Sequence, residues 1–378
     1  MGTVASVPYA GTAWGHMHIV GGLKRLGHEV HYFETTSAWP YDPVRRTPVC
    51  DSDYALPYLQ RVLEGFGLAD HWAYRRSYLD GAWLGPSANQ AGELLAHADA
   101  VFNVGGATPL DKNEVGRLVY FDTDPVIHEL SYDRGDTTTR WMIDQHDDIV
   151  TYGENIGRPG CAVPPLPRLR SRTRQPVLLD LWDADAPSRA AFTTVGNWKQ
   201  EGYDVEWRGE IYLWSKHHEF LKFIELPTRI APPIEIATNL KNLDPESRRL
   251  LDANRWHLVD AQFTADPWRY RDYVQTSRGE FTVAKDQNVR FRSGWFSDRS
   301  ASYLAAGRPV ITQDTGFGTV LPVGEGLFSF NTLEDIVSAF AAIEADYARH
   351  SRAARTIAEE CFRAETVLAR VLSDLGLA

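Results

Sequence analysis

The chain has 378 residues, with 39 Lys and Arg against 50 Asp and Glu, so its formal net charge is −11. This acidic balance excludes nonspecific binding to nucleic acid through a basic face, but it leaves room for a small phosphorylated ligand in a local pocket. Hydrophobic residues make up 43% of the chain, which is ordinary for a globular protein, and single cores stop growing at about 250 to 300 residues, so we expect two domains.

Cysteine usage and the lack of long apolar runs bear on location. The three cysteines, Cys50, Cys161 and Cys361, lie far apart and show no paired spacing, so neither a disulfide framework nor a zinc site is indicated. The first residues lack a basic stretch followed by an apolar run, and no run of 18 apolar residues occurs. We therefore expect a cytoplasmic protein without integral membrane contact.

The opening segment, residues 4–33, reads as a strand, a glycine-bearing loop, a helix and a second strand. Val4 to Val7 predicts the first strand, and Gly11 to Gly15 predicts a loop that brings backbone amides toward an anion or a hydroxyl group. His16 and His18 follow in the predicted helix. Residues two apart do not share a helical face, so at most one of these imidazoles faces a cleft.

The rest of the first half alternates between helix-like and strand-like segments. The predicted helices span 56–66 and 87–96, and the predicted strands span 100–104, 117–121 and 149–152. Each strand stops at Gly, Asp or Asn, as buried parallel strands do when they end in functional loops. Residues 158–176 then contain five prolines and five arginines, and we interpret them as the linker between a first domain, 1–165, and a second, 175–355.

The second half repeats the alternation. Predicted strands span 175–182, 192–195, 256–260 and 281–284, and a predicted helix spans 267–277. A helix beginning at Ser293 and Gly294 and ending at Gly307 leads into the apolar run Pro309-Val-Ile311, which stops at the turn Asp314-Thr-Gly316. Ligands of parallel sheets bind beyond the carboxyl ends of the strands, so this turn is expected at a cleft. Residues 332–375 predict two or three helices.

Two motifs carry a resemblance to a known fold family. The segment Ala305-Ala-Gly-Arg-Pro-Val310 followed by Thr315-Gly316, and the opening Leu23-Lys-Arg-Leu-Gly-His-Glu-Val30, resemble the GT-B glycosyltransferases. The resemblance covers about the first 35 residues and the last hundred. It implies an α/β protein with two Rossmann-like domains facing across a cleft, and C-terminal helices, residues 356–378, crossing back to the first domain. It also implies a nucleoside-diphosphate sugar as donor, a small-molecule acceptor, and no metal or cofactor.

Three residues are candidates for catalysis under this resemblance. Inverting GT-B enzymes often place a histidine at the position of His16 as general base, a task suited to a group that titrates near neutral pH. Asp122 and Asp124 end a predicted strand, and one of them is expected to orient a histidine or an acceptor hydroxyl. A metal-binding Asp-x-Asp motif and a simple cap for the helix after Pro125 are the other interpretations of this pair.

The donor diphosphate is expected to bind basic side chains and a helix N-terminus in the second domain. The cationic run around Arg208 and Lys216 is a further candidate for contact with the diphosphate. The residues that we assign to the donor site are Lys199, Lys285, Arg290, Ser293, Gly294, Asp298, Arg299, Asp314, Thr315 and Gly316. Retaining GT-B enzymes carry glutamates where this chain has Gly294 and Ser302, so the sequence leaves open whether the enzyme inverts or retains.

Two other functions remain open at this point. A nucleotide-sugar epimerase of similar fold would need carboxylates around the sugar, which Asp122, Asp124, Glu154 and Asp314 could supply. A non-catalytic nucleotide-sugar-binding protein would explain the missing glutamates. The sequence does not decide whether the protein forms a homodimer.

Overall fold

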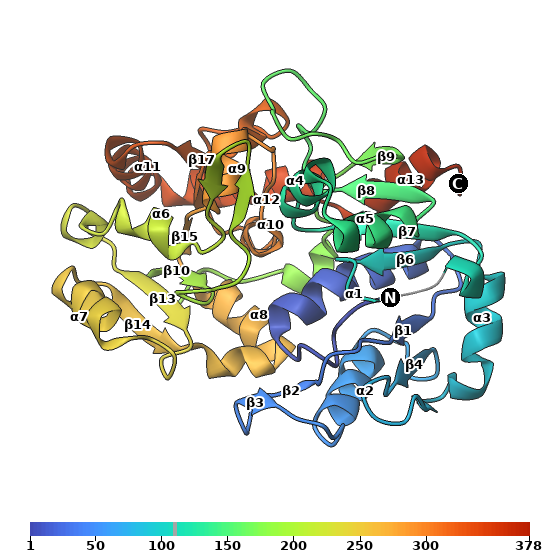
Figure 1. The fold of residues 1–378 in the computed structure, drawn as a ribbon. Helices are drawn as coiled ribbons and strands as arrows, with labels where there is room; N and C mark the ends of the chain where they lie inside the picture. Colours follow the sequence, from blue (N-terminus) through green and yellow to red (C-terminus); the bar gives the residue numbers. More distant parts are fainter. Residues whose placement is uncertain (109–111) are drawn as a thin grey trace.

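The computed structural model describes residues 1–108 and 112–378. It shows two α/β domains side by side, each built on mostly parallel strands flanked by helices (Figure 1). The prediction of an α/β fold with two Rossmann-like halves is therefore confirmed.

The first domain contains most of the elements up to residue 172. They are α1 (Ala10–Arg25), β1 (Tyr32–Glu34), β2 (Tyr41–Asp42), β3 (Thr47–Pro48), α2 (Ala55–Gly65), β4 (Trp72–Arg75), β5 (Trp83–Leu84), η1 (Ala88–Gln90), α3 (Ala91–His97), β6 (Val101–Val104), η2 (Lys112–Glu114), β7 (Leu118–Asp122), α4 (Ile127–Arg134), α5 (Thr137–Asp144), β8 (Asp148–Thr151) and β9 (Leu169–Arg172).

The remaining elements belong mainly to the second domain. They are η3 (Leu179–Trp182), β10 (Phe192–Val195), β11 (Val205–Trp207), β12 (Glu210–Tyr212), α6 (His217–Leu221), η4 (Leu226–Thr228), β13 (Ile234–Thr238), α7 (Pro245–Ala253), β14 (His257–Asp260), η5 (Ala261–Ala265), α8 (Pro267–Thr276), β15 (Gly279–Thr282), α9 (Asp286–Phe291), α10 (Asp298–Ala305), β16 (Val310–Gln313), η6 (Phe317–Thr319), β17 (Leu327–Phe330), α11 (Leu333–Ala345), α12 (Tyr347–Cys361) and α13 (Ala364–Leu375).

The sheet of the second domain has six parallel strands in the order β14-β13-β10-β15-β16-β17. Its central strands are buried on both faces, which explains why they read as short continuous apolar runs in the sequence. The chain order reverses between β10 and β15. In open α/β sheets the crevice beyond the strand ends at such a point binds ligands.

The sheet of the first domain is divided into two parts. One part has the order β1-β4-β5 and the other the order β6-β7-β8-β9. Met1 and Gly2 lie between them (Figure 1): the Gly2 N–H donates to the Phe33 carbonyl at 3.2 Å, and the Val104 N–H donates to the Met1 carbonyl at 3.1 Å.

The opening segment differs from the prediction in two places. Val4 to Val7 form turns rather than a strand, because the amides of Ala5 and Ser6 bond to the buried Glu34 carboxylate instead of to a neighbouring strand. The predicted glycine loop is also wrong, since α1 begins at Ala10 and includes Gly11 and Gly15. Gly15 faces α10, because a Cβ at this position would lie 3.6 Å from the Asp298 carboxylate, an ordinary contact distance.

The predicted linker and the strand after it also need correction. Leu169–Arg172, inside the predicted linker, form β9, which pairs in parallel with β8 as the last strand of the first sheet. In the predicted strand 175–182, only Val177 makes a single bridge, to Arg363, and Leu179–Trp182 form a 3₁₀ turn. The apolar run is buried by packing against α1 and α12 neighbours, not by a sheet.

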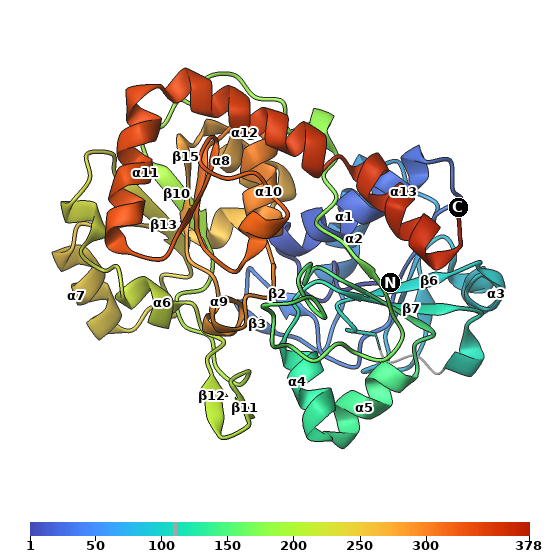
Figure 2. The same cartoon turned by 90° about the horizontal axis from the view of Figure 1, so that it is seen from above.

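The C-terminal helices join the two domains. In the view of Figure 2, α11 and α12 lie over the second domain and α13 continues onto the first, where Leu368 and Leu372 share a core with Ile19 and Leu23 of α1. The chain thus crosses back to the first domain as predicted. Within the described residues, none of the helices combines the length and apolarity that crossing a bilayer requires.

Candidate functional site

A pocket of about 270 Å³ lies between the two domains. Its walls come from the start of α1 on one side and, on the other, from the loops that follow β10, β13 and β14. The residues that line it are Tyr9, Gly11, Thr12, Tyr41, Pro43, Arg46, Val195, Gly196, Asn197, Asn239, Asp260, Ala261, Gln262, Thr264, Tyr270, Asp298 and Arg299. This is the cleft position that the reversal of strand order predicts.

A buried carboxylate holds the first-domain wall of this pocket in place. Glu34, at the end of β1, accepts hydrogen bonds from the Ala5 and Ser6 amides, the Ser6 hydroxyl and the Tyr32 hydroxyl, at 2.5 to 2.9 Å. Burial raises the pKa of Glu34, while these donors lower it. The network fixes the turn that leads to Tyr9 and α1.

Arg299 stands at the other wall, in the first turn of α10, and each of its three guanidinium nitrogens donates one hydrogen bond within the protein. The guanidinium pairs with the buried Glu280 carboxylate, and it donates to the Val195 carbonyl at 2.6 Å and to the Thr282 hydroxyl at 2.8 Å. It therefore ties β10, β15 and α10 together. Asp298 precedes it and faces the pocket, and burial raises the pKa of this carboxyl.

Two lysines gather beside this arginine at the domain boundary. The Lys285 ammonium, just beyond β15, pairs with Asp124 of the first domain and lies 2.8 Å from the centre of the Trp214 ring. The Lys216 ammonium lies 5.4 Å from the centre of the Trp295 ring, and no carboxylate among the described residues forms an ion pair with it. Burial, followed by the charges of Arg299 and Lys285, lowers the pKa of Lys216 to about 7.

Asp122 and Asp124 occupy different surroundings. Asp122 is buried at the end of β7 and accepts a 2.7 Å bond from the Thr151 hydroxyl; burial raises its pKa to about 6. Asp124 is partly exposed at the boundary, and its second oxygen has no hydrogen-bond partner among the described residues. Asp124 is thus the more exposed of the two carboxylates, although its unpartnered oxygen is buried, whereas Asp122 lies behind it with Glu129, whose pKa burial also raises.

A metal site is another interpretation of the Asp122–Asp124 pair that the sequence allows. In the part of the chain that the structure describes, no three His, Cys, Asp or Glu side chains come together in a way that could hold a metal ion. Metal independence stays a prediction.

Four of the predicted diphosphate residues lie instead at a junction between the domains. Ser293 and Gly294 do not begin a helix, because α10 starts at Asp298. The Asn155 amide N–H donates to the Ser293 carbonyl at 3.0 Å, and its side chain donates to the Gly316 carbonyl at 3.0 Å. The Gly294 N–H donates to the Thr315 carbonyl at 2.8 Å, so these backbone groups are engaged with one another.

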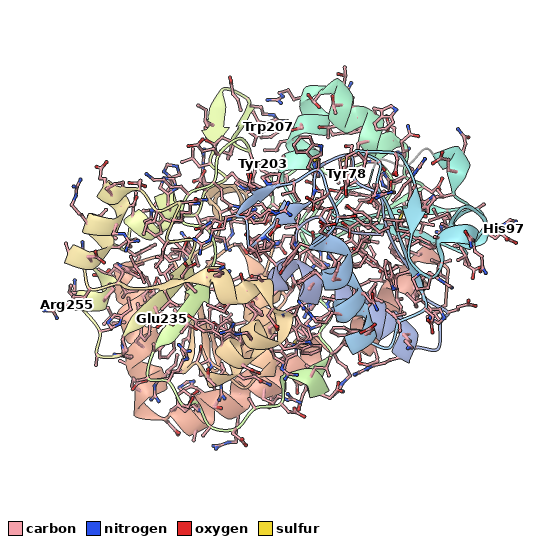
Figure 3. The ribbon with its side chains drawn as sticks, turned by 90° about the horizontal axis from the view of Figure 1, so that it is seen from below. Tyr78, His97, Tyr203, Trp207, Glu235 and Arg255 are labelled. Carbon is pink, nitrogen blue, oxygen red and sulfur yellow. The ribbon has the colours of Figure 1, made fainter. Side chains whose placement is uncertain are left out.

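Three further predicted donor residues have protein partners. Lys199 pairs with Asp244 at 2.9 Å, and Asp314 pairs with Arg292 at 3.0 Å. Arg290 pairs with Glu210 of the β11–β12 hairpin, and Trp207, which faces Glu210 across the two strands, donates to Asp133 of α4 at 2.9 Å. Arg290 thus holds the hairpin whose Trp207 reaches the first domain (Figure 3).

The predicted orientation of His16 is wrong. Its ring packs against Tyr32 and Gly2, inside the first domain, and lines a cavity there rather than the pocket between the domains. Nδ1 contacts the Thr12 carbonyl at 2.7 Å, and burial lowers the pKa of His16 to about 4. His18 is buried as well and accepts a bond from Trp182 at 3.0 Å.

Several important residues were not assigned from the sequence. Glu34 fixes the first-domain wall of the cleft, Asn155 holds the junction between the domains, and Trp214 and Trp295 lie beside the lysines. An acidic residue inside an apolar strand was a usable signal for Glu34. Asn155, Trp214 and Trp295 are brought to the domain boundary by contacts between distant parts of the chain or by an irregular loop. No local sequence pattern indicates such contacts.

Comparison with known proteins gives the fold. No protein family's sequence pattern matches the chain, and no curated protein matches it. Among solved structures, the chain is similar to Anabaena Alr3699/HepE in complex with UDP and glucose, with 12% identity and a TM-score of 0.56, over 93% of this chain and 100% of that one. The same protein in complex with UDP-glucose gives 13% identity and a TM-score of 0.54, over 92% and 99%.

A third similar structure is AviGT4, a glycosyltransferase involved in avilamycin A biosynthesis, with 12% identity and a TM-score of 0.49 over 95% of this chain and 87% of that one. Likeness to HepE at this level of identity establishes architecture only. The chain has the GT-B fold, as the two sequence motifs predicted.

Proposed function

We propose that this protein is a glycosyltransferase that moves a sugar from a nucleoside-diphosphate sugar to a small-molecule acceptor. The observation that carries the proposal is Lys216, a partly buried ammonium without a carboxylate partner among the described residues, at the point where the strand order of the second sheet reverses. A charge that is partly removed from water favours a partner that neutralises it. A bound anion would do so.

The surroundings of Lys216 favour a diphosphate over a single charge. Lys285 and Arg299 are close enough to lower the pKa of Lys216 by repulsion, and the neighbouring carboxylates of Glu280, Asp124 and Asp298 act in the opposite direction. A diphosphate would bring two phosphate groups to this cluster. Gly196, with open space where a Cβ would stand, allows the chain after β10 to come near such a group.

The nucleoside would occupy the adjoining pocket. At about 270 Å³ the pocket lies just below the range of about 300 to 1,000 Å³ that is typical of small-molecule sites, so it suits one part of a nucleotide sugar rather than all of it. Tyr9 and Tyr270 offer aromatic surfaces, and Asp260 and Asn239 offer polar groups for a base or ribose.

Transfer breaks the bond between the anomeric carbon and a diphosphate oxygen, and the bonding electrons stay on that oxygen. The acceptor hydroxyl forms the new bond and loses its proton. Fixed cations next to the leaving diphosphate, Lys216 and Lys285, would stabilise the charge that develops there. Asp124, with one oxygen free of protein partners, is the carboxylate that we assign to the acceptor hydroxyl or the donor sugar.

The epimerase alternative has less support from the geometry. Among the carboxylates that it would need, Glu154 pairs with Arg174 at 2.8 Å and Asp314 pairs with Arg292, while Asp122 is buried against Thr151. These three carboxylates are already engaged within the protein, so they are less available to a sugar than the epimerase reaction would require.

A ligand screen tests the proposal. Thermal unfolding would be recorded with UDP, GDP, ADP or dTDP, with the matching nucleosides, and with inorganic phosphate. A nucleoside diphosphate at about 100 times its dissociation constant stabilises the folded state by about 2.7 kcal/mol, and we expect one base to show this shift while nucleosides and phosphate show less. Sugar release from the matching NDP-sugar then requires an acceptor extract. No shift with any diphosphate would contradict the proposal.

A further inference from the structure

An ion pair connects the two domains at the boundary where the proposed function places its substrates. Asp124 lies just beyond β7 of the first domain, and the Lys285 ammonium, just beyond β15 of the second, donates to its Oδ2 atom. Each residue thus follows the carboxyl end of a parallel strand, which is where open α/β sheets bind their ligands.

The lysine is the more shielded partner of this ion pair. The side chain of Lys285 is 8% exposed, whereas that of Asp124 is 36% exposed. The Lys285 ammonium also lies 2.8 Å from the centre of the Trp214 ring. Burial lowers the pKa of Lys285, and the charge of Asp124 raises it. Lys285 therefore needs an anion beside it, and Asp124 is the anion that the protein supplies.

Both partners have other tasks in the proposed reaction. The donor diphosphate needs the Lys285 ammonium, and the acceptor hydroxyl or the donor sugar needs the Asp124 carboxylate. In this structure one carboxylate oxygen of Asp124 is bonded to Lys285, and the other is buried without a hydrogen-bond partner among the described residues. The two groups can therefore serve the substrates only after they separate.

The backbone on both sides of Asp124 is held by buried carboxylates. The Asp124 N–H donates to the Asp122 carboxylate at 3.3 Å, and the Val126 N–H donates to the Glu129 carboxylate at 2.7 Å. Val126 has φ +100°, a value that β-branched residues rarely adopt, so these contacts maintain a specific loop conformation. With its backbone held in this way, Asp124 can leave Lys285 by rotation of its side chain.

We propose that the Lys285–Asp124 ion pair sets the order in which the substrates bind. The donor diphosphate displaces the Asp124 carboxylate from Lys285, and the displaced carboxylate then accepts a hydrogen bond from the acceptor hydroxyl. The inference rests on the proposed function and adds to it a dependence of the acceptor site on the donor.

A diphosphate is a stronger partner for this lysine than a carboxylate. It presents two phosphate groups, and Lys216 lies close enough to Lys285 for the charge of Lys285 to lower its pKa, so both ammonium groups could contact one diphosphate. Asp124 offers a single charge through one oxygen. After the exchange, the diphosphate and the Asp124 carboxylate repel each other because both are negative. This repulsion keeps the carboxylate away from the lysine and free for the acceptor.

Asp124→Asn tests the exchange, because the amide has the shape of the carboxylate but cannot neutralise Lys285. Calorimetry would measure the affinity of the wild type and the variant for UDP, GDP, ADP or dTDP, whichever raises the unfolding temperature most. We expect Asp124→Asn to bind this nucleoside diphosphate at least about fivefold more tightly, the lower end of the range that is typical of coupled binding events.

Asp133→Asn is the matched control. Asp133 also lies at the domain boundary, where it accepts a hydrogen bond from Trp207, but it forms no ion pair among the described residues. This variant loosens a contact between the domains without freeing a cation, so its affinity should equal that of the wild type. A gain equal to that of Asp124→Asn would mean that looser domains are the cause, and it would overturn the proposal.

A double-mutant cycle separates the exchange from long-range repulsion between charges. Lys285→Met should weaken diphosphate binding, and in that background Asp124→Asn should have no further effect, because no ion pair remains to be displaced. An equal gain from Asp124→Asn with and without Lys285 would show that the carboxylate acts only through its general charge. That result would overturn the proposal.

A crystal structure with the bound nucleoside diphosphate gives a direct test. We expect Lys285 to contact a phosphate oxygen and Asp124 to be separated from it, whereas an intact ion pair beside a bound diphosphate would overturn the proposal. Equal affinities of the wild type and Asp124→Asn would overturn the exchange and leave the proposed function in place. If neither protein bound any of the four nucleoside diphosphates, both the exchange and the proposed function would be wrong.

Discussion

Arg299 and Lys216 lie close together at the same edge of the second sheet, but only Arg299 forms an ion pair with a carboxylate among the described residues. The Arg299 guanidinium has a buried carboxylate and two oxygen acceptors, so its charge is already paired and it holds three elements in place. Lys216 is desolvated without an ion pair among the described residues. A basic residue at a strand end therefore indicates a ligand site only when its partners within the protein are known.

The largest loss of unfolding free energy should come from replacing Arg299, whose charge is paired within the protein. Arg299→Met leaves the Glu280 carboxylate, which is fully buried, without its partner, and breaking a buried ion pair costs about 3 to 5 kcal/mol. Urea unfolding should show this loss in the free energy of unfolding. The double variant Arg299→Met/Glu280→Gln, which removes the unpaired charge, should recover part of it; equal instability of both variants would mean that the ion pair is not the cause.

Removing the unpaired cation should weaken binding while sparing the fold. For Lys216→Met we expect nucleoside-diphosphate affinity to fall about 10- to 100-fold, because hydrogen bonds to charged groups contribute about 1.5 to 3 kcal/mol. Stability should stay the same or rise, since a buried charge is removed. Calorimetry of both properties checks this, with Lys24→Met, on the exposed end of α1, as the matched control.

If Lys216→Met bound the nucleotide as tightly as Lys24→Met does, Lys216 would not contact the diphosphate. A loss of stability together with affinity would place Lys216 with Arg299 as a structural group, and the contrast between them would disappear.

The backbone groups at the Asn155 junction are also hydrogen-bonded within the protein. A substitution there should lower stability, as at Arg299, but by less. Gly294 has φ +76°, and an added Cβ would lie 2.8 Å from the Asn155 backbone nitrogen. Gly294→Ala should cost about 1 to 3 kcal/mol of unfolding free energy through backbone strain, with a smaller change in nucleotide affinity than Lys216→Met gives. Gly92→Ala, in α3 with open space around it, should be neutral or slightly stabilising.

The sequence predicted the fold more fully than the site, for physical reasons. Short apolar runs such as Phe192–Val195 become strands because burial on both faces requires that composition, and they can be recognised locally. Whether Arg290 or Lys199 is free for a ligand depends on Glu210 and Asp244, which distant parts of the chain supply. Local patterns contain no such information. The sequence therefore identifies the basic residues but does not show which of them is free to bind a ligand.

The first strand shows another limit of local patterns. Val4 to Val7 have strand-like composition, but the sheet position is filled by Met1 and Gly2, and Glu34 turns the following residues away. The resemblance to GT-B enzymes placed His16 at the cleft on the assumption of a strand at Val4. With the strand position shifted toward Met1, the histidine falls inside the first domain.

The last predicted effect is the pH dependence of stability that Lys216 contributes. Its pKa is about 7 in the folded protein, below the value of 10.5 that it has when exposed. Between these values the unfolded chain binds the proton and the folded protein does not, so stability should rise as the pH increases from about 7 toward 10. One proton limits the slope to about 1.4 kcal/mol per pH unit.

Urea unfolding of the wild type and of Lys216→Met at pH 6, 7.5 and 9 isolates this contribution, because the other titrating groups are common to both. The wild type should gain stability relative to the variant above pH 7, whereas Lys24→Met should follow the wild type throughout. Parallel curves for the wild type and Lys216→Met would show that the ammonium is already neutralised within the protein, which would make it equivalent to Arg299.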